Sequence, residues 1–163
     1  MAVIGIDPGT AITGYGIILE SENGNLQAID YGAILTGKTS LPEVRLLHIY
    51  KQLREILIIH KPDCGAVERL YFQQNVRTAL SVGQARGVIL LALADAQIPV
   101  YEYNPVDVKQ AVSGYGRADK KQVQQMIKML LNLDEAPQPD DAADALAVAI
   151  CHIQSHRILG LSK

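Results

Sequence analysis

The stretch AVIGIDPGTAITGYGIIL (residues 2–19) predicts two strands joined by a tight turn. Its halves AVIGID and TGYGIIL are apolar runs of the kind found in strands, and Pro8 and Gly9 between them are turn formers. A third strand is predicted at LQAIDYGAIL (residues 26–35). Because the connections between these runs are short, we expect the three strands to form an antiparallel meander.

Helices and further strands follow the meander. Apolar residues recur at helical spacing over residues 41–60, and a strand is predicted directly after them at DCGAVERL (residues 63–70). The remaining predicted elements are helices near residues 76–96, 105–112, 119–132 and 139–156, with a short strand at PVYEY (residues 99–103). Strands separated by a crossover helix lie parallel to their neighbours. We therefore predict an α/β fold with a five-stranded mixed sheet, three strands antiparallel and two parallel, and helices on both faces.

The composition indicates one globular domain. The chain has 163 residues, 48% of them hydrophobic and 20% charged, so we expect a single domain at residues 1–157 and a short tail at residues 158–163. Cys64 and Cys151 lie in apolar runs and match neither a zinc-ligand spacing nor a disulfide framework, which predicts small core residues of a reducing compartment. The longest apolar run, residues 88–94, is too short to span a bilayer, and we expect a cytoplasmic protein without membrane contact.

Four acidic residues occur where each of them suits one metal site. Asp7 closes the first predicted strand and Glu68 lies near the end of the fourth, and the ends of neighbouring central strands can converge on one point. Asp141 and Asp144, three residues apart near the start of a helix, project from one face of that helix. Carboxylate sites favour hard ions such as Mg2+ or Mn2+. Two such ions about 3.5 to 4 Å apart can activate water for phosphodiester hydrolysis, so the four acids predict nucleic-acid cleavage.

The helical acids also have a structural interpretation. Asp140 or Asp141, directly after Pro139, is typical of a helix N-cap. Asp144 lies in mid-helix beside alanines, where nothing local calls for a charge, so its structural interpretation is the weakest of the four.

The strand acids have structural alternatives as well. Asp7 could cap the turn that follows it. Glu68 could form a buried ion pair with Arg69 or Arg86. Neither alternative is excluded by the sequence around these two residues.

One segment is basic although the net charge is −2. Between residues 109 and 128 the single acid Asp119 is accompanied by five cations, Lys109, Arg117, Lys120, Lys121 and Lys128. This segment predicts a phosphate-binding strip beside the acidic site. The alternative is that these side chains only solvate a helix face.

Several of these motifs together resemble the RuvC family of bacterial Holliday junction resolvases, the crossover junction endodeoxyribonucleases. The matching stretches run nearly end to end and in the family's order: IGIDPGTAITGYG, AVERLYF, ALSVGQARGV, VKQAVSGYG, ADKKQVQ and PQPDDAADALAVAI. The resemblance implies a ribonuclease-H-like fold, a homodimer and Mg2+ dependence, with Mn2+ as a substitute. It also implies paired symmetric nicks in two strands of like polarity of a four-way DNA junction during homologous recombination and DNA repair, leaving 5'-phosphate and 3'-hydroxyl ends. RuvA and RuvB, the branch-migration proteins, are the partners that the family expects.

Residue by residue, the resemblance places the four metal-binding catalytic acids of the family on Asp7, Glu68, Asp141 and Asp144. An extra acid, Asp140, precedes the D-x-x-D motif, and only the pair at 141 and 144 preserves the spacing to ADALA. Asp140 is then expected to be an N-cap or an outer-shell acid.

The resemblance also marks residues for DNA contact. The family has an aromatic wedge after the catalytic glutamate, and this chain offers Tyr71, which fits the register better, and Phe72. Stacking on an unpaired base contributes roughly 1 to 3 kcal/mol, although both rings could instead pack in the core. Lys109 and Lys120 are expected near the scissile phosphate, where a cation can neutralise developing charge.

Two features of the helices bear on partners and metals. Gly83 and Gly87 lie four apart in the helix near residues 76–96 and would let another backbone approach, and the resemblance implies that this helix contributes to the dimer contact. His152 and His156 lack the glutamate of a zinc-protease motif and are expected at a solvated helix end, without a metal role.

Three rival functions share parts of this pattern. G-x-D-x-G-T also resembles the first phosphate loop of actin-like ATPases and sugar kinases, but those proteins need two such domains and this chain has one copy of the motif. A ribonuclease H would have the same acids. A junction-binding paralogue with an inactive site would not be expected to keep all four.

Overall fold

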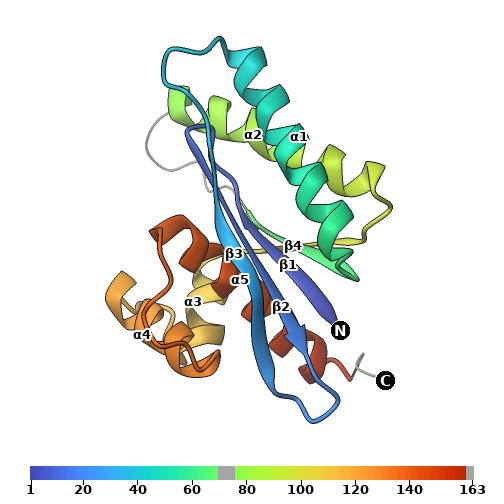
Figure 1. Ribbon diagram of the computed structural model, residues 1–163. Coiled ribbons are helices and arrows are strands. Elements are labelled where there is room, and N and C mark those ends of the chain that lie inside the picture. Colours follow the sequence, from blue (N-terminus) through green and yellow to red (C-terminus); the bar gives the residue numbers. More distant parts are fainter. Residues whose placement is uncertain (70–75, 161–163) are drawn as a thin grey trace.

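The computed structural model describes residues 1–69 and 76–160, and it contains a five-stranded mixed sheet (Figure 1). The strands are β1 (Ala2–Asp7), β2 (Ile12–Glu20), β3 (Leu26–Leu35), β4 (Cys64–Glu68) and β5 (Val100–Tyr103), in the order β3-β2-β1-β4-β5. The pairs β1–β2 and β2–β3 are antiparallel, whereas β1–β4 and β4–β5 are parallel. The predicted α/β fold is therefore confirmed.

Helices cover both faces of this sheet. They are α1 (Pro42–His60), α2 (Val76–Asp95), α3 (Pro105–Ser113), α4 (Lys120–Leu130) and α5 (Asp140–Ile158). Figure 1 shows α1 and α2 on one face and α3, α4 and α5 on the other. Each boundary lies within a few residues of its predicted position. In the part of the chain that the structure describes, no helix is both long and apolar enough to cross a membrane.

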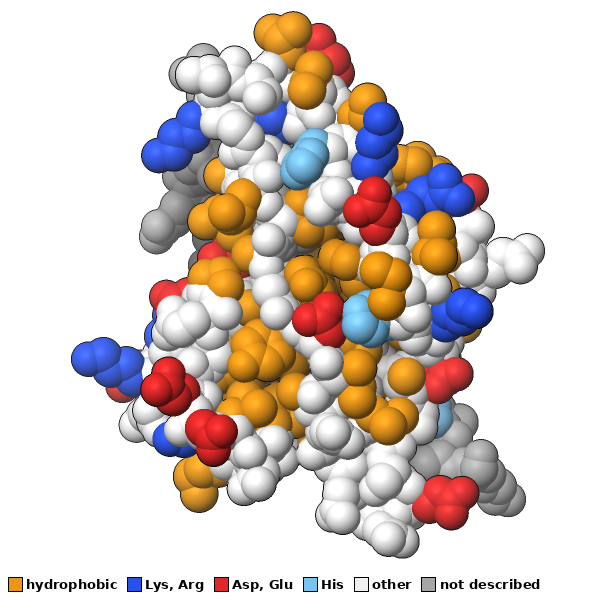
Figure 2. Space-filling model, in the orientation of Figure 1, with side chains coloured by type: hydrophobic (Ala, Val, Ile, Leu, Met, Phe, Trp, Pro, Cys, Tyr) orange, Lys and Arg blue, Asp and Glu red, His pale blue; other side chains and the backbone are white. Residues whose placement is uncertain are grey.

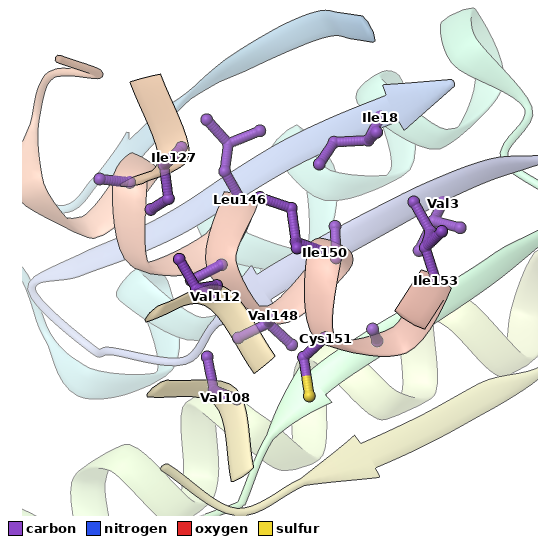
Figure 3. Close-up of a cluster of buried hydrophobic side chains, with 14 of the residues drawn as sticks. Val3, Ile18, Val108, Val112, Ile127, Leu146, Val148, Ile150, Cys151 and Ile153 are labelled. Carbon is purple, nitrogen blue, oxygen red and sulfur yellow. The ribbon is translucent and has the colours of Figure 1, made fainter. Parts of the chain in front are cut away.

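The two faces of the sheet bury two separate hydrophobic clusters. Because side chains alternate along a strand, Val3 of β1 joins the cluster under α3, α4 and α5, and the next residue, Ile4, joins the cluster under α1 and α2. Figure 3 shows the first cluster, where Leu146 and Ile150 of α5 lie against β1 and β2. The second cluster contains the buried residues of α1 and of α2.

Glycines in the sheet let α5 lie unusually close to it. A Cβ added to Gly5 of β1 would come 2.0 Å from the carbonyl oxygen of Ala145, and one added to Gly14 of β2 would come 1.9 Å from that of Asp141. The facing side of α5 is correspondingly rich in buried alanine. Small residues on both elements therefore fix how far the N-terminal turns of α5 stand from the strand ends.

The predicted placement at a solvated helix end is wrong for His152, whereas His156 lies half-buried in the last turn of α5. The His152 side chain is 1% exposed, and its ring nitrogens lie 2.8 Å from the Tyr103 hydroxyl and 3.2 Å from the Cys64 sulfur. The error arises because the last turns of α5 still pack on the sheet, so that a polar residue on the inner face is buried. Cys64 and Cys151 are free and buried, as expected.

Candidate active site

Two of the predicted acids lie side by side at one edge of the sheet. The central strands β1 and β4 are parallel, with Ile6 opposite Val67, and each strand ends one residue later, at Asp7 and at Glu68. Both carboxylates are half-buried. The strand ends therefore hold these two acids together, as the sequence predicted.

The N-terminal turns of α5 supply the other two acids. Gly14, the β2 partner of Asp7 in the sheet, is the residue at which the backbone of Asp141 makes its close approach. Asp144 lies one turn further along α5 and lines the same pocket as Glu68. The close packing of α5 on glycine thus brings its acidic turn to the strand ends.

The four acids act on one another electrostatically. Burial, followed by the charges of Glu68, Asp144 and Asp141, raises the pKa of Asp7 to about 8, with the charge of Lys120 opposing the rise. Burial raises the pKa of Glu68 to about 7, with the charge of Asp144 acting in the same direction and that of Lys109 opposing it. The pKa of Asp144 is also raised, chiefly by burial. A cluster of this kind needs protons or a cation to relieve its repulsion.

Two lysines of the basic strip stand beside the acids. A pocket of about 230 Å³ is lined by Lys109, Lys120, Glu68 and Asp144 together with apolar residues of α3, α4 and α5. Lys120 forms an ion pair with Asp144, with its Nζ atom 3.2 Å from the Oδ2 atom. Burial alone would lower the pKa of Lys120, but the acids around it raise the pKa.

Asp140, the extra acid, is not the N-cap that one reading of the sequence expected. The cap residue of α5 is Pro139, and Asp140 is the first residue of the helix. Its carboxylate accepts a hydrogen bond from the side chain of Gln124 at 2.8 Å and forms an ion pair with Lys120 at 3.2 Å. These contacts, with the Gln124 hydrogen bond foremost, lower the pKa of Asp140.

The donor set fits a hard divalent cation, although the side chains need to turn to bind one. Among residues 1–69 and 76–160, no three His, Cys, Asp or Glu side chains are arranged to hold a metal ion as they stand. Asp144 instead points its carboxylate at Lys120. The four carboxylates lie close enough for the other three to shift the pKa of Asp7, and they supply only oxygen ligands, which Mg2+ and Mn2+ prefer.

Comparison with known proteins assigns the chain to a family. The model of the family described as crossover junction endodeoxyribonuclease RuvC matches residues 3–152. The chain belongs to the RuvC family. This assignment confirms the resemblance seen in the sequence and decides against the actin-like ATPases and sugar kinases.

Individual RuvC relatives match over almost their whole length. The RuvC protein of Caldicellulosiruptor saccharolyticus is 54% identical over 156 residues, which are 95% of this chain and 93% of the relative. That of Chloroflexus aurantiacus is 58% identical over 152 residues, covering 93% and 92%. The solved structure of T. thermophilus RuvC with a Holliday junction substrate has a TM-score of 0.89 and 33% identity, covering 97% and 96%. The yeast mitochondrial resolvase Ydc2, at 13% identity and a TM-score of 0.72, shows the shared fold alone.

The ion-pair alternative for Glu68 of this RuvC chain is not borne out. Arg69 and Arg86 both form ion pairs with Glu102 of β5 rather than with Glu68, so the buried pair proposed for Glu68 is wrong. The turn after Asp7 is closed by the Thr13 hydroxyl, which donates to the Gly9 carbonyl at 2.6 Å.

The remaining predicted DNA contacts lie around this RuvC site or outside the described residues. Tyr71 and Phe72 fall in residues 70–75, which the structure does not describe. Arg117 and Lys121 are exposed, and Lys121 lines an open groove of about 480 Å³ with Tyr115. The sequence analysis did not single out Tyr115, although an aromatic ring between two glycines of a basic strip was a usable signal.

Proposed function

We propose that this RuvC protein is a divalent-metal-dependent endonuclease that resolves four-way DNA junctions by paired symmetric nicks in strands of like polarity. The observation that carries the proposal is the meeting of four acids from β1, β4 and α5 with two lysines at one edge of the sheet. The T. thermophilus RuvC structure supports the substrate, because that relative is solved with a Holliday junction. Homologous recombination and DNA repair are the processes that such an activity serves.

The four acids would hold the metal, which we propose to be Mg2+, two ions per site, with Mn2+ as a substitute. When bound, the metal would activate the attacking water and stabilise the leaving oxygen, so that the products carry 5'-phosphate and 3'-hydroxyl ends. Asp7, Glu68 and Asp144 sit in half-buried positions where water competes little for their charge. Asp141 completes the set from the first turn of α5.

The lysines would act on the phosphate rather than on the metal. Lys109 and Lys120 line the pocket that holds Glu68 and Asp144, and a cation there would neutralise charge that develops on the scissile phosphate. Figure 2 shows Lys and Arg side chains interspersed with Asp and Glu on the face in view, without a broad basic field.

Further DNA contacts are proposed at two places beyond the pocket. Arg117 and Lys121 are exposed near the first turn of α4 and would bind backbone phosphates. Tyr71 and Phe72, outside the described residues, would supply the ring that stacks on an opened base at the centre of the junction.

We also propose that the chain acts as a homodimer through α2. Leu80 and Leu91 lie on one side of this helix and are 66% and 60% exposed, and a Cβ added to Gly87 between them would meet nothing within 4 Å. The packing of the described chain therefore does not require a glycine there, whereas a second copy would. RuvA and RuvB remain expected partners, and the cytoplasm the expected location.

A panel of end-labelled substrates tests the proposal. The chain would be incubated with Mg2+ and a mobile synthetic four-way DNA junction, a linear duplex of the same sequence, and an RNA/DNA hybrid. We expect paired symmetric nicks on the junction alone. Cleavage of the hybrid would place the chain with the ribonucleases H, and junction binding without any cleavage would indicate an inactive paralogue.

A further inference from the structure

Lys120 lies between two carboxylates on successive turns of α5. Its Nζ atom is 3.2 Å from Oδ2 of Asp144 and 3.2 Å from Oδ2 of Asp140. The two acids differ in surroundings, because Asp144 lines the pocket with Glu68 and Asp140 stands outside it. One ammonium group thus joins an acid of the site to an acid at its rim.

Asp140 is held to α4 by two side chains. Besides its ion pair with Lys120, Asp140 accepts a hydrogen bond at 2.8 Å from Gln124, which lies one turn after Lys120 in α4. The start of α4 is itself fixed, since Asp119 and Gln122 cap it with reciprocal hydrogen bonds. The first turn of α4 and the first turn of α5 therefore form a connected unit that places Lys120.

We propose that Asp140 is a positioning residue, which keeps Lys120 at the active site when a divalent metal takes Asp144. The proposal rests on the proposed function of the four acids. Lys120 is the counter-ion of Asp144 in the metal-free chain, and a metal that binds Asp144 would compete with it for the carboxylate. Asp140 then retains the ammonium group beside the pocket, where the scissile phosphate would meet it.

The effects of substitutions at residues 120 and 140 on metal affinity are predicted to depend on each other. Titration calorimetry with Mn2+ alone, on the full chain without DNA, would compare wild type with Lys120→Gln, Asp140→Asn and the double variant. Lys120→Gln removes the competing cation and should tighten Mn2+ binding about two- to fivefold. Asp140→Asn removes one of the two ion-pair partners of Lys120, so that Lys120 pairs more strongly with Asp144. This variant should weaken Mn2+ binding by a similar factor. In the Lys120→Gln background the same change at 140 should have little effect.

Matched controls separate this exchange from a general charge effect. Lys121→Gln and Glu135→Gln remove exposed charges of each sign that form no ion pair with Asp144 among the described residues, and they should change Mn2+ affinity less than their counterparts at 120 and 140. Asp140→Glu keeps the charge and should restore wild-type affinity, which excludes misfolding as the cause of the Asn result. The inference is overturned if Asp140→Asn weakens binding equally in both backgrounds, or if Lys121→Gln tightens it as much as Lys120→Gln. A wild-type chain that binds no Mn2+ would instead overturn the proposed function.

Discussion

At the scale of single residues, the four carboxylates repel one another in the folded chain. Burial and three neighbouring carboxylates raise the pKa of Asp7 from its ordinary 3.8 to about 8. The folded state therefore binds the Asp7 proton more tightly than the unfolded state does. As the pH rises from about 4 towards 8, the unfolded chain releases this proton first, and the folded state loses stability relative to it. The acids that would bind a cation therefore lower the stability of the protein when no metal is bound.

This repulsion predicts that Asp7→Asn stabilises the metal-free protein. Asparagine has nearly the same shape and no charge to bury, so the free energy of unfolding should rise by about 1 to 4 kcal/mol at pH 8, and by less at pH 6. Urea unfolding in the presence of a chelator at both pH values measures the difference. A variant that is less stable than wild type, or a gap that does not widen with pH, would contradict the electrostatic description of the site.

At the scale of elements, the site depends on how closely α5 lies on the sheet. Gly14 pairs with Asp7 in the sheet and meets the backbone of Asp141 on the helix. Neither contact involves a carboxylate group, yet together they set where the acids of α5 stand relative to those of the strands. A change in this spacing should reach all four acids at once.

Gly14→Ala is predicted to damage both stability and activity. Its Cβ would lie 1.9 Å from the carbonyl oxygen of Asp141, a backbone atom that moves only if α5 moves. We expect a loss of about 1 to 3 kcal/mol in the free energy of unfolding and a loss of metal-dependent cleavage at temperatures where the variant is folded. Gly116→Ala is the matched control, since the nearest atom to its added Cβ would be a side-chain atom, Cγ1 of Val106 at 3.0 Å, rather than the backbone of a packed helix. Equal effects of the two substitutions on the unfolding free energy would contradict the packing argument.

The strands and helices were predicted from local patterns. Apolar runs beside turn formers marked β1 and β2, and the helical spacing of apolar residues marked α1, because each pattern is a local property of the chain. The burial of His152 and the contacts of Asp140 could not be predicted in this way. The first depends on which turns of α5 the sheet covers, and the second on α4 lying beside α5. The four acids could be predicted from the sequence around each of them, but only the folded chain shows that Lys120 pairs with Asp144.

At the scale of the whole molecule, the site and the proposed dimer surface use different parts of the fold. The acids lie at the ends of β1 and β4 and on the N-terminal turns of α5, whereas the exposed side of α2 belongs to the opposite layer (Figure 1). A symmetric pair of chains joined through α2 would carry two equivalent sites. Two sites related by a twofold axis match two symmetric nicks in one junction.

Leu91→Glu is predicted to weaken the dimer without disturbing the fold. Its side chain is 60% exposed in the single chain, so a charge costs little there, but in the proposed dimer the charge would be buried without a partner. Light scattering coupled to size exclusion should show a shift from dimer to monomer, and junction cleavage should change from paired to single nicks. Met129→Glu on α4, where the side chain is 72% exposed, should leave the mass unchanged. An unchanged dimer mass in Leu91→Glu would contradict the assignment of this surface.

The four acids are predicted to catalyse cleavage of a four-way junction that the rest of the molecule binds. The most direct measurement compares wild type and Asp7→Asn on one labelled four-way junction, with binding followed by gel shift and cleavage followed in the same samples with Mg2+. We predict equal junction affinity, paired symmetric nicks by wild type, and none by the variant. Cleavage by Asp7→Asn at the wild-type rate would contradict the account.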